Sequence, residues 1–182
     1  HMLRCLLLLL IALGITACSN LYRPISSLES DAMAKSRRDV FPNDFRNSKA
    51  SFGSVEIAWA GVIRSSKIND SGDHYEIDLE LEHHYFDWVM DNSQFHLSPR
   101  GEGLVKTKWS LLKSLPPDTV ANEVKSGRMI VVYGFPESLA SEFLVVRATY
   151  LRTFGPGSFR TNTMDYGRPG EPVKFLKPEG VL

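Results

Sequence analysis

The stretch HYEIDLELEHHYF, residues 74–86, alternates apolar and polar side chains and decides the fold class. From Tyr75 to Leu81 every second residue is apolar, and the residues between them are acidic. Because successive side chains of a strand point to opposite faces, the pattern predicts a half-buried antiparallel strand. The segment NDSGD (69–73) before it contains turn-forming residues and predicts a hairpin with the strand that precedes it.

Further segments predict four more strands and one short helix. The helix is indicated by DTVANEVKSG (118–127), which starts with Asp and Thr and ends with Gly, so we expect it over about 118–126. One of the strands, at 128–135, is apolar on both faces, as a central or barrel strand would be. The four strand segments are SVEIAWAGVIR (54–64), GLVKTKWSLL (103–112), RMIVVYGF (128–135) and EFLVVRATYLRTF (142–154).

The order of these elements is three strands, a helix and two strands, which is the order of an OB-fold, a five-stranded Greek-key barrel. We therefore predict a mainly β protein with an OB-fold-like barrel domain over 51–154 and one short helix. Residues 18–50 are interrupted by Pro, Ser, Asp and Arg, which indicates a flexible tether, with a short helix around 27–38 as the alternative. Residues 155–182 are rich in Gly and Pro and predict an extended arm. The arm would lie against the barrel through Phe159, Tyr166 and Phe175.

The N-terminus has the pattern of a secretory signal. His1 looks like a cloning scar before Met2; Arg4 then precedes an apolar run over 5–15, too short for a comfortable membrane span. The run ends in Ile-Thr-Ala-Cys, which resembles the bacterial lipobox. The resemblance implies that residues 1–17 are a lipoprotein signal peptide and that Cys18 carries lipid chains, which anchor a protein stably when there are two or more. Ser19, in place of an aspartate, favours the outer membrane, with the protein facing the periplasm.

Size and charge exclude some function classes. The chain has 182 residues, 21 basic and 21 acidic, and a formal charge of zero, which argues against a nucleic-acid partner. Its cysteines are Cys5 and Cys18, so a chain cut before Cys18 forms no internal disulfide. The Ser-x-x-Lys pattern at 110–113 occurs without the companion motifs of penicillin-binding enzymes, and we interpret it as chance. We expect a protein that is not an enzyme and has no cofactor.

Three segments resemble the Slp-type outer-membrane lipoproteins: WAGVI (59–63), EIDLELEHHYFD (76–87) and SGRMIVVYGFPES (126–138). They are similar to that family's first and second strands and to its Gly-Arg strand and turn. Ala60 stands where the family has the first glycine of a pair. The resemblance covers about 52–150 and implies an envelope location and a barrel fold, but no reaction.

The segment EHHYFDWVMD (82–91) supplies the candidate site residues. Glu82 and His84 share a strand face and are weak candidates for metal ligands, with a third ligand from Asp87 or Asp91. Strand alternation argues against His83 joining them. A second hypothesis is an aromatic contact surface, and the alternative is that the same rings cap the barrel core. The four aromatic residues are Tyr85, Phe86, Trp88 and Phe95.

The acidic row on the polar face of 74–86 indicates either a partner surface or a solvated face paired with Lys106 and Lys108 of a neighbouring strand.

The function we predict is that of a lipid-anchored outer-membrane lipoprotein with a structural or protein-interaction role. It would attach to the membrane through Cys18 and meet an envelope protein or the cell wall. The alternative is a lipoprotein that binds a small ligand or cation through residues 82–96.

Overall fold

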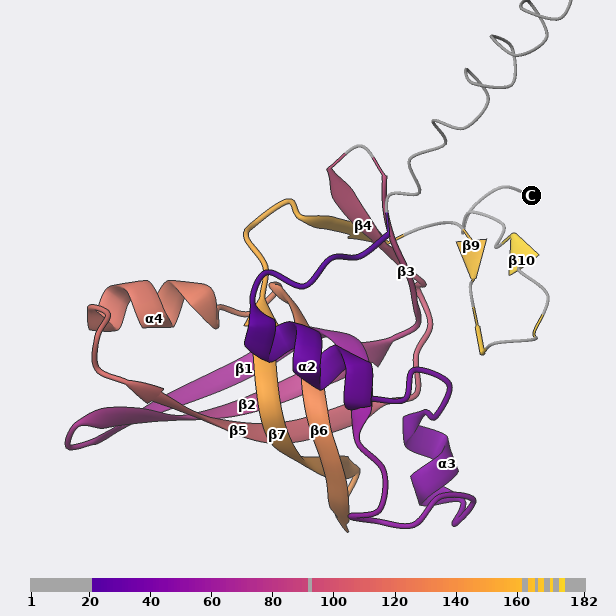
Figure 1. The fold of residues 1–182 in the computed structure, drawn as a ribbon, viewed down its shortest axis with the longest axis horizontal. Coiled ribbons are helices and arrows are strands. Elements are labelled where there is room, and N and C mark those ends of the chain that lie inside the picture. Colours follow the sequence, from indigo (N-terminus) through magenta and orange to yellow (C-terminus); the bar gives the residue numbers. More distant parts are fainter. Residues whose placement is uncertain are drawn as a thin grey trace, which may run out of the picture.

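The computed structural model describes residues 21–91, 93–161, 164–165, 167–168, 171 and 174–175, and its centre is a closed barrel (Figure 1). The strand order is β1-β2-β5-β7-β6, and β6 pairs back onto β1. The helix α4 (Pro117–Glu123) stands between β5 and β6, so the predicted OB-fold is confirmed. The five strands are β1 (Ile57–Ser71), β2 (His74–His84), β5 (Leu104–Leu112), β6 (Met129–Ala140) and β7 (Phe143–Thr153).

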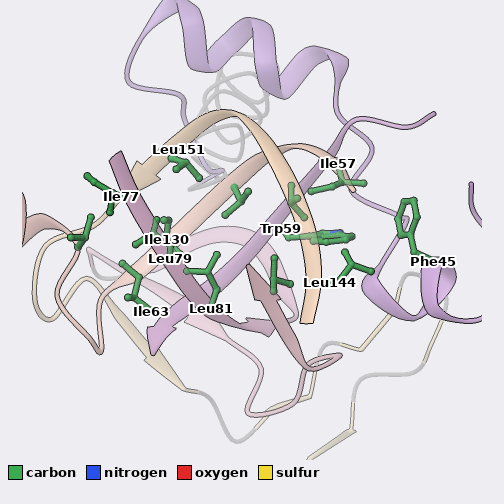
Figure 2. Close-up of a cluster of buried hydrophobic side chains, with 14 of the residues drawn as sticks. Phe45, Ile57, Trp59, Ile63, Ile77, Leu79, Leu81, Ile130, Leu144 and Leu151 are labelled. Carbon is green, nitrogen blue, oxygen red and sulfur yellow. The ribbon is translucent and has the colours of Figure 1, made fainter. Parts of the chain in front are cut away.

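The register of the barrel follows the alternation in the sequence. Ile77 and Leu79 of β2 point inward and are buried, and β1 and β5 pair antiparallel on either side of them. β5 and β7 pair in parallel over four residues only, from Leu104 to Thr107 on β5. The barrel interior is packed with aliphatic side chains around Trp59, as Figure 2 shows. Helix α4 adds Val120 to this core, and the residue that follows the helix, Val124, packs there as well.

Gly61 in β1 marks a point where two backbones come close. A Cβ atom placed on it would lie 2.7 Å from the carbonyl oxygen of Glu82 on β2. Glycine within a strand is typical of such close approaches. A larger residue there would push β1 away from β2.

A second hydrophobic core lies on the outside of the barrel. Met129, Val131 and Tyr133 of β6 point away from the barrel interior and are fully buried. They are covered by helix α2 (Ser27–Lys35) and by a small sheet in the order β3-β4-β8. The strands of that sheet are β3 (Phe86–Asp91), β4 (Gln94–Leu97) and β8 (Phe159–Thr161). This cover explains why the sequence of β6 is apolar on both faces.

Residues 21–50 do not form the expected flexible tether. Helix α2 is capped by Ser26, whose hydroxyl accepts from Glu29 N, and it packs Ala32 into the second core. The short helix α3 (Pro42–Arg46) buries Phe45 in the barrel core. Trp59 Nε1 donates to the carbonyl oxygen of Val40 at 2.7 Å. The polar composition of the segment hid these few deep contacts, each of which is made with a distant strand.

The C-terminal arm forms a strand soon after it begins. β8 pairs in parallel with β4, and Phe159 packs against the second core as predicted. β9 (Met164–Asp165) pairs with β10 (Lys174–Phe175). The predicted contacts of Tyr166 and of the Phe175 side chain lie outside the described residues, as does Cys18. Among the residues that are described, no helix is long and apolar enough to cross a membrane.

Candidate functional site

The aromatic residues proposed as a contact surface lie mainly inside the second core. Phe86, Trp88 and Phe95 surround Tyr22, with ring centroids 5.2 to 5.9 Å from the Tyr22 ring. Phe95 is buried, and Phe86 and Trp88 are partly buried. These rings therefore pack as the core-capping alternative describes, but on the outer wall of the barrel. Tyr22, the centre of the cluster, came from a segment we expected to be a tether.

Trp88, like Phe86, borders open space on one side of this cluster. Its φ is +60°, a conformation that is strained for a bulky residue. The Arg38 guanidinium lies 5.4 Å from the centroid of its ring. Both residues line a groove of about 720 Å³ that Leu21 and Phe41 also border. An aromatic ring and a cation at a groove could hold a small ligand there.

Tyr85 points to the other side, into a buried polar cluster around Glu102. The Tyr85 hydroxyl donates to a Glu102 carboxylate oxygen at 2.6 Å, and Arg168 of the C-terminal arm donates to the same oxygen at 2.8 Å. Glu102 N donates to Nδ1 of His83 at 3.0 Å. Burial lowers the pKa of His83 to about 3, so the ring is neutral and its Nδ1 acts as an acceptor. This cluster fixes the loop 98–103 to the barrel rim, and it leaves Tyr85 no role on the surface.

The weak metal candidates are not brought into a ligand set. His84 Nδ1 lies 2.8 Å from the carbonyl oxygen of Ser98, which can only accept, so the imidazole donates to the backbone. Glu82 is exposed at the surface. Within the described part of the chain, no three His, Cys, Asp or Glu side chains come together as metal ligands. The side chain of Asp91, one of the two predicted third ligands, is outside that part.

The acidic row of β2 pairs with β5, as the sequence predicts. Lys106 Nζ lies 3.2 Å from a Glu80 carboxylate oxygen, and Lys108 Nζ lies 3.6 Å from Asp78. A hydrogen bond from Ser65 and the nearby Lys106 ammonium lower the pKa of Glu80. These groups are between two-fifths and four-fifths exposed, so each pair contributes little to stability, about 0–1 kcal/mol.

These ion pairs line a groove of about 710 Å³ across the outer wall of the barrel. β7 contributes Arg147, whose Nε donates to Glu137 of β6 at 2.6 Å. Two partly buried apolar residues of β7, Val145 and Ala148, lie between the charges. The β2 and β5 sides of this site were visible in the sequence as alternating charges. The β7 side was missed, because the parallel pairing of β5 with β7 joins residues about forty positions apart and leaves no local pattern.

The groove carries charges of both signs. Cations and carboxylates alternate along it, so it does not present the basic footprint that nucleic acids require. It lies on the second and third strands of the barrel, which is the face that OB-folds use for ligands. An extended polypeptide with its own mixture of charges and apolar side chains is the ligand class that such a surface matches.

Comparison with known proteins adds no family to this description. No model of a protein family matches the chain, and no curated protein matches it either. The similarity to Slp-type lipoproteins stays a prediction from the three motifs.

Proposed function

We propose that this protein is a lipid-anchored lipoprotein of the bacterial outer membrane that acts by binding an envelope protein and catalyses no reaction. The lipobox that ends at Cys18 supports the anchor. The charged groove across β2, β5 and β7 supports the binding role, and it is the observation that carries the proposal.

The groove suits exchange of ion pairs with a partner. Its carboxylates and cations are already paired within the chain and remain exposed, so each pair is weak. A partner segment can replace these contacts with its own charges at small cost while it covers the apolar residues between them. Complementary charges of this kind set the specificity and the rate of association.

Charge reversal of the groove tests this proposal. We would replace Lys106 and Arg147 by glutamate in the full chain and place a photo-crosslinking amino acid at Val145. Crosslinks to one envelope protein should form in the parent and fall about tenfold in the variant, a loss of about 1.4 kcal/mol. Lys125→Glu, an exposed charge next to α4, is the matched control and should keep the crosslink.

The melting temperature of each variant shows whether the barrel stays folded, since the reversed charges are exposed. Crosslinking at full strength in a folded Lys106→Glu/Arg147→Glu variant would contradict the groove as the binding surface. Absence of any crosslink from Val145 in the parent would contradict it as well.

A second candidate function is binding of a small ligand in the groove beside Trp88. The cation of Arg38 over the Trp88 ring favours it. A titration that changes tryptophan fluorescence in the parent and not in Arg38→Ala would support this function. A titration series of metals and glycans without any change would oppose it.

A further inference from the structure

The point where the described chain begins is fixed to the barrel. Tyr22 N donates to the carbonyl oxygen of Trp88 at 2.8 Å, and Leu21 forms an antiparallel bridge with Val89 of β3. The Tyr22 ring is 5% exposed and lies in the second core. A few residues later the Glu29 carboxylate is fully buried and accepts from the hydroxyl of Tyr133 on β6. Residues 21–29 are therefore part of the folded domain.

This attachment leaves very little chain between the domain and Cys18. Three residue steps join Cys18 to Leu21, and a fully extended chain covers at most about 11 Å over that distance. If Cys18 carries lipid, Leu21 is held within that distance of the bilayer. The domain then lies directly on the membrane, because no spacer is available to lift it away.

Several large apolar side chains are exposed close to this point of the chain. Leu21 is 56% exposed, Ile25 and Leu28 are each 68% exposed, and Met90 of the neighbouring β3 is 37% exposed. They are four of the eight large hydrophobic residues exposed in the described chain. Single apolar residues on a surface are ordinary, whereas several in two adjoining segments mark a contact site.

We infer that this patch, made of Leu21, Ile25, Leu28 and Met90, rests in the headgroup region of the phospholipid bilayer that holds the anchor. The inference rests on the proposed lipidation of Cys18. Apolar side chains of a peripheral helix enter the boundary between headgroups and acyl chains in this way. The bilayer contacts this face of the domain, because the lipid on Cys18 enters the bilayer next to Leu21.

The same placement frees the charged groove. On β7, Arg152 lies beside Glu29 and Tyr22, whereas Arg147 lines the groove five residues earlier, which is about 17 Å along a strand. Figure 1 shows the first described residues beside β3 and β4, and the turn between β6 and β7 at the opposite end of the barrel. The groove therefore lies toward the end of the barrel that is farther from the anchored N-terminus, where an envelope partner can reach it.

Fluorophores on single cysteines test the orientation in the full, lipidated chain. The lipidated thiol of Cys18 does not react, so Ile25→Cys and Met90→Cys report on the patch. Leu139→Cys, 47% exposed near the turn between β6 and β7, is the matched control. The proteins would be reconstituted into vesicles of phosphatidylethanolamine and phosphatidylglycerol that contain nitroxide-labelled lipid. We expect quenching at both patch positions about threefold stronger than at Leu139→Cys, as for side chains at the depth of the headgroups.

The mass of the N-terminal peptide separates the two hypotheses. Lipidated protein with equal quenching at all three positions would overturn the orientation and leave the anchor intact. An N-terminal peptide without lipid would overturn the anchor, and the orientation with it. Leu28→Ser in the Met90→Cys protein is a further check, and it should weaken the quenching if the patch itself contacts lipid.

Discussion

Replacing Glu29 by alanine should detach residues 21–35 from the outer wall of the barrel. The carboxylate accepts from the hydroxyls of Tyr22 and Tyr133, from Ile25 N at 2.8 Å and from the Arg152 guanidinium at 3.4 Å. A buried donor that loses its acceptor costs about 1–3 kcal/mol. Breaking a buried ion pair by removing one partner costs about 3–5 kcal/mol.

We expect the total cost of Glu29→Ala to be close to the cost of breaking the buried ion pair alone, and not to the sum of all the lost contacts. Arg152 keeps a bond to the carbonyl oxygen of Arg23, and its side chain is 13% exposed and so reaches water. We expect a loss of about 3–5 kcal/mol in the free energy that holds the segment to the barrel. The loss should appear as faster hydrogen exchange in residues 22–35 while the amides of β2 and β5 stay protected.

Two variants make the result specific. Glu29→Gln keeps one acceptor oxygen and should lose less than Glu29→Ala, about 1–3 kcal/mol. Asp31→Ala changes an exposed carboxylate in the same helix and should leave exchange unchanged. Equal protection of residues 22–35 in Glu29→Ala and in the parent would refute the reasoning, since it would mean that the buried carboxylate does not hold the segment.

Three more predictions concern other parts of the molecule. Gly101→Ala should lower the free energy of unfolding by at least about 1–3 kcal/mol, because the new Cβ would lie 1.6 Å from the carbonyl oxygen of His83. An unchanged denaturant midpoint would contradict this close approach. His83 has its pKa lowered to about 3, so the unfolded chain takes up a proton that the fold excludes, and stability should fall as pH falls from about 6.5 to 3. His83→Asn keeps an acceptor for Glu102 N. In urea unfolding at a series of pH values, it should remove up to about 4 kcal/mol of the pH dependence of stability. A pH dependence as steep as the parent's would show that other groups cause it. Cys18→Ser should leave an uncut precursor, and a processed, membrane-bound species of native mass would contradict the lipid anchor.

The barrel was predictable because its strands carry local patterns. Alternation in 75–81 set the inward face of β2, and the charges opposite it anticipated the pairs of Glu80 with Lys106 and of Asp78 with Lys108. The Gly and Asp residues at 70–73 marked the turn between β1 and β2. Each of these signals depends on residues only a few positions apart, so it can be recognised in the sequence alone.

The second core was not predictable in the same way. Helix α2 has no long apolar stripe, and its main attachment is a charged residue, Glu29, whose bonding partner Tyr133 lies 104 positions away. From the sequence, the hairpin of β3 and β4 was predicted to be an aromatic loop. Nothing close to it in the sequence shows that Tyr22 packs between the rings of Phe86 and Trp88. A buried carboxylate looks like a surface residue until its donors are known. The apolar outer face of β6 was the available signal that something covers the barrel there.

The position of β6 between the two cores also sets an order of assembly. Its inner face completes the barrel, and its outer face is the surface on which residues 21–35 lie. Those residues are synthesised first, yet the strand on which they pack is made about a hundred positions later. Contacts between such distant parts of a chain form slowly. Residues 21–35 can therefore pack only after β6 has joined the barrel. Until then, the apolar outer face of β6, with Met129, Val131 and Tyr133, is exposed and can bind wrong partners. A chaperone that shields this strand would protect it from wrong partners during that interval.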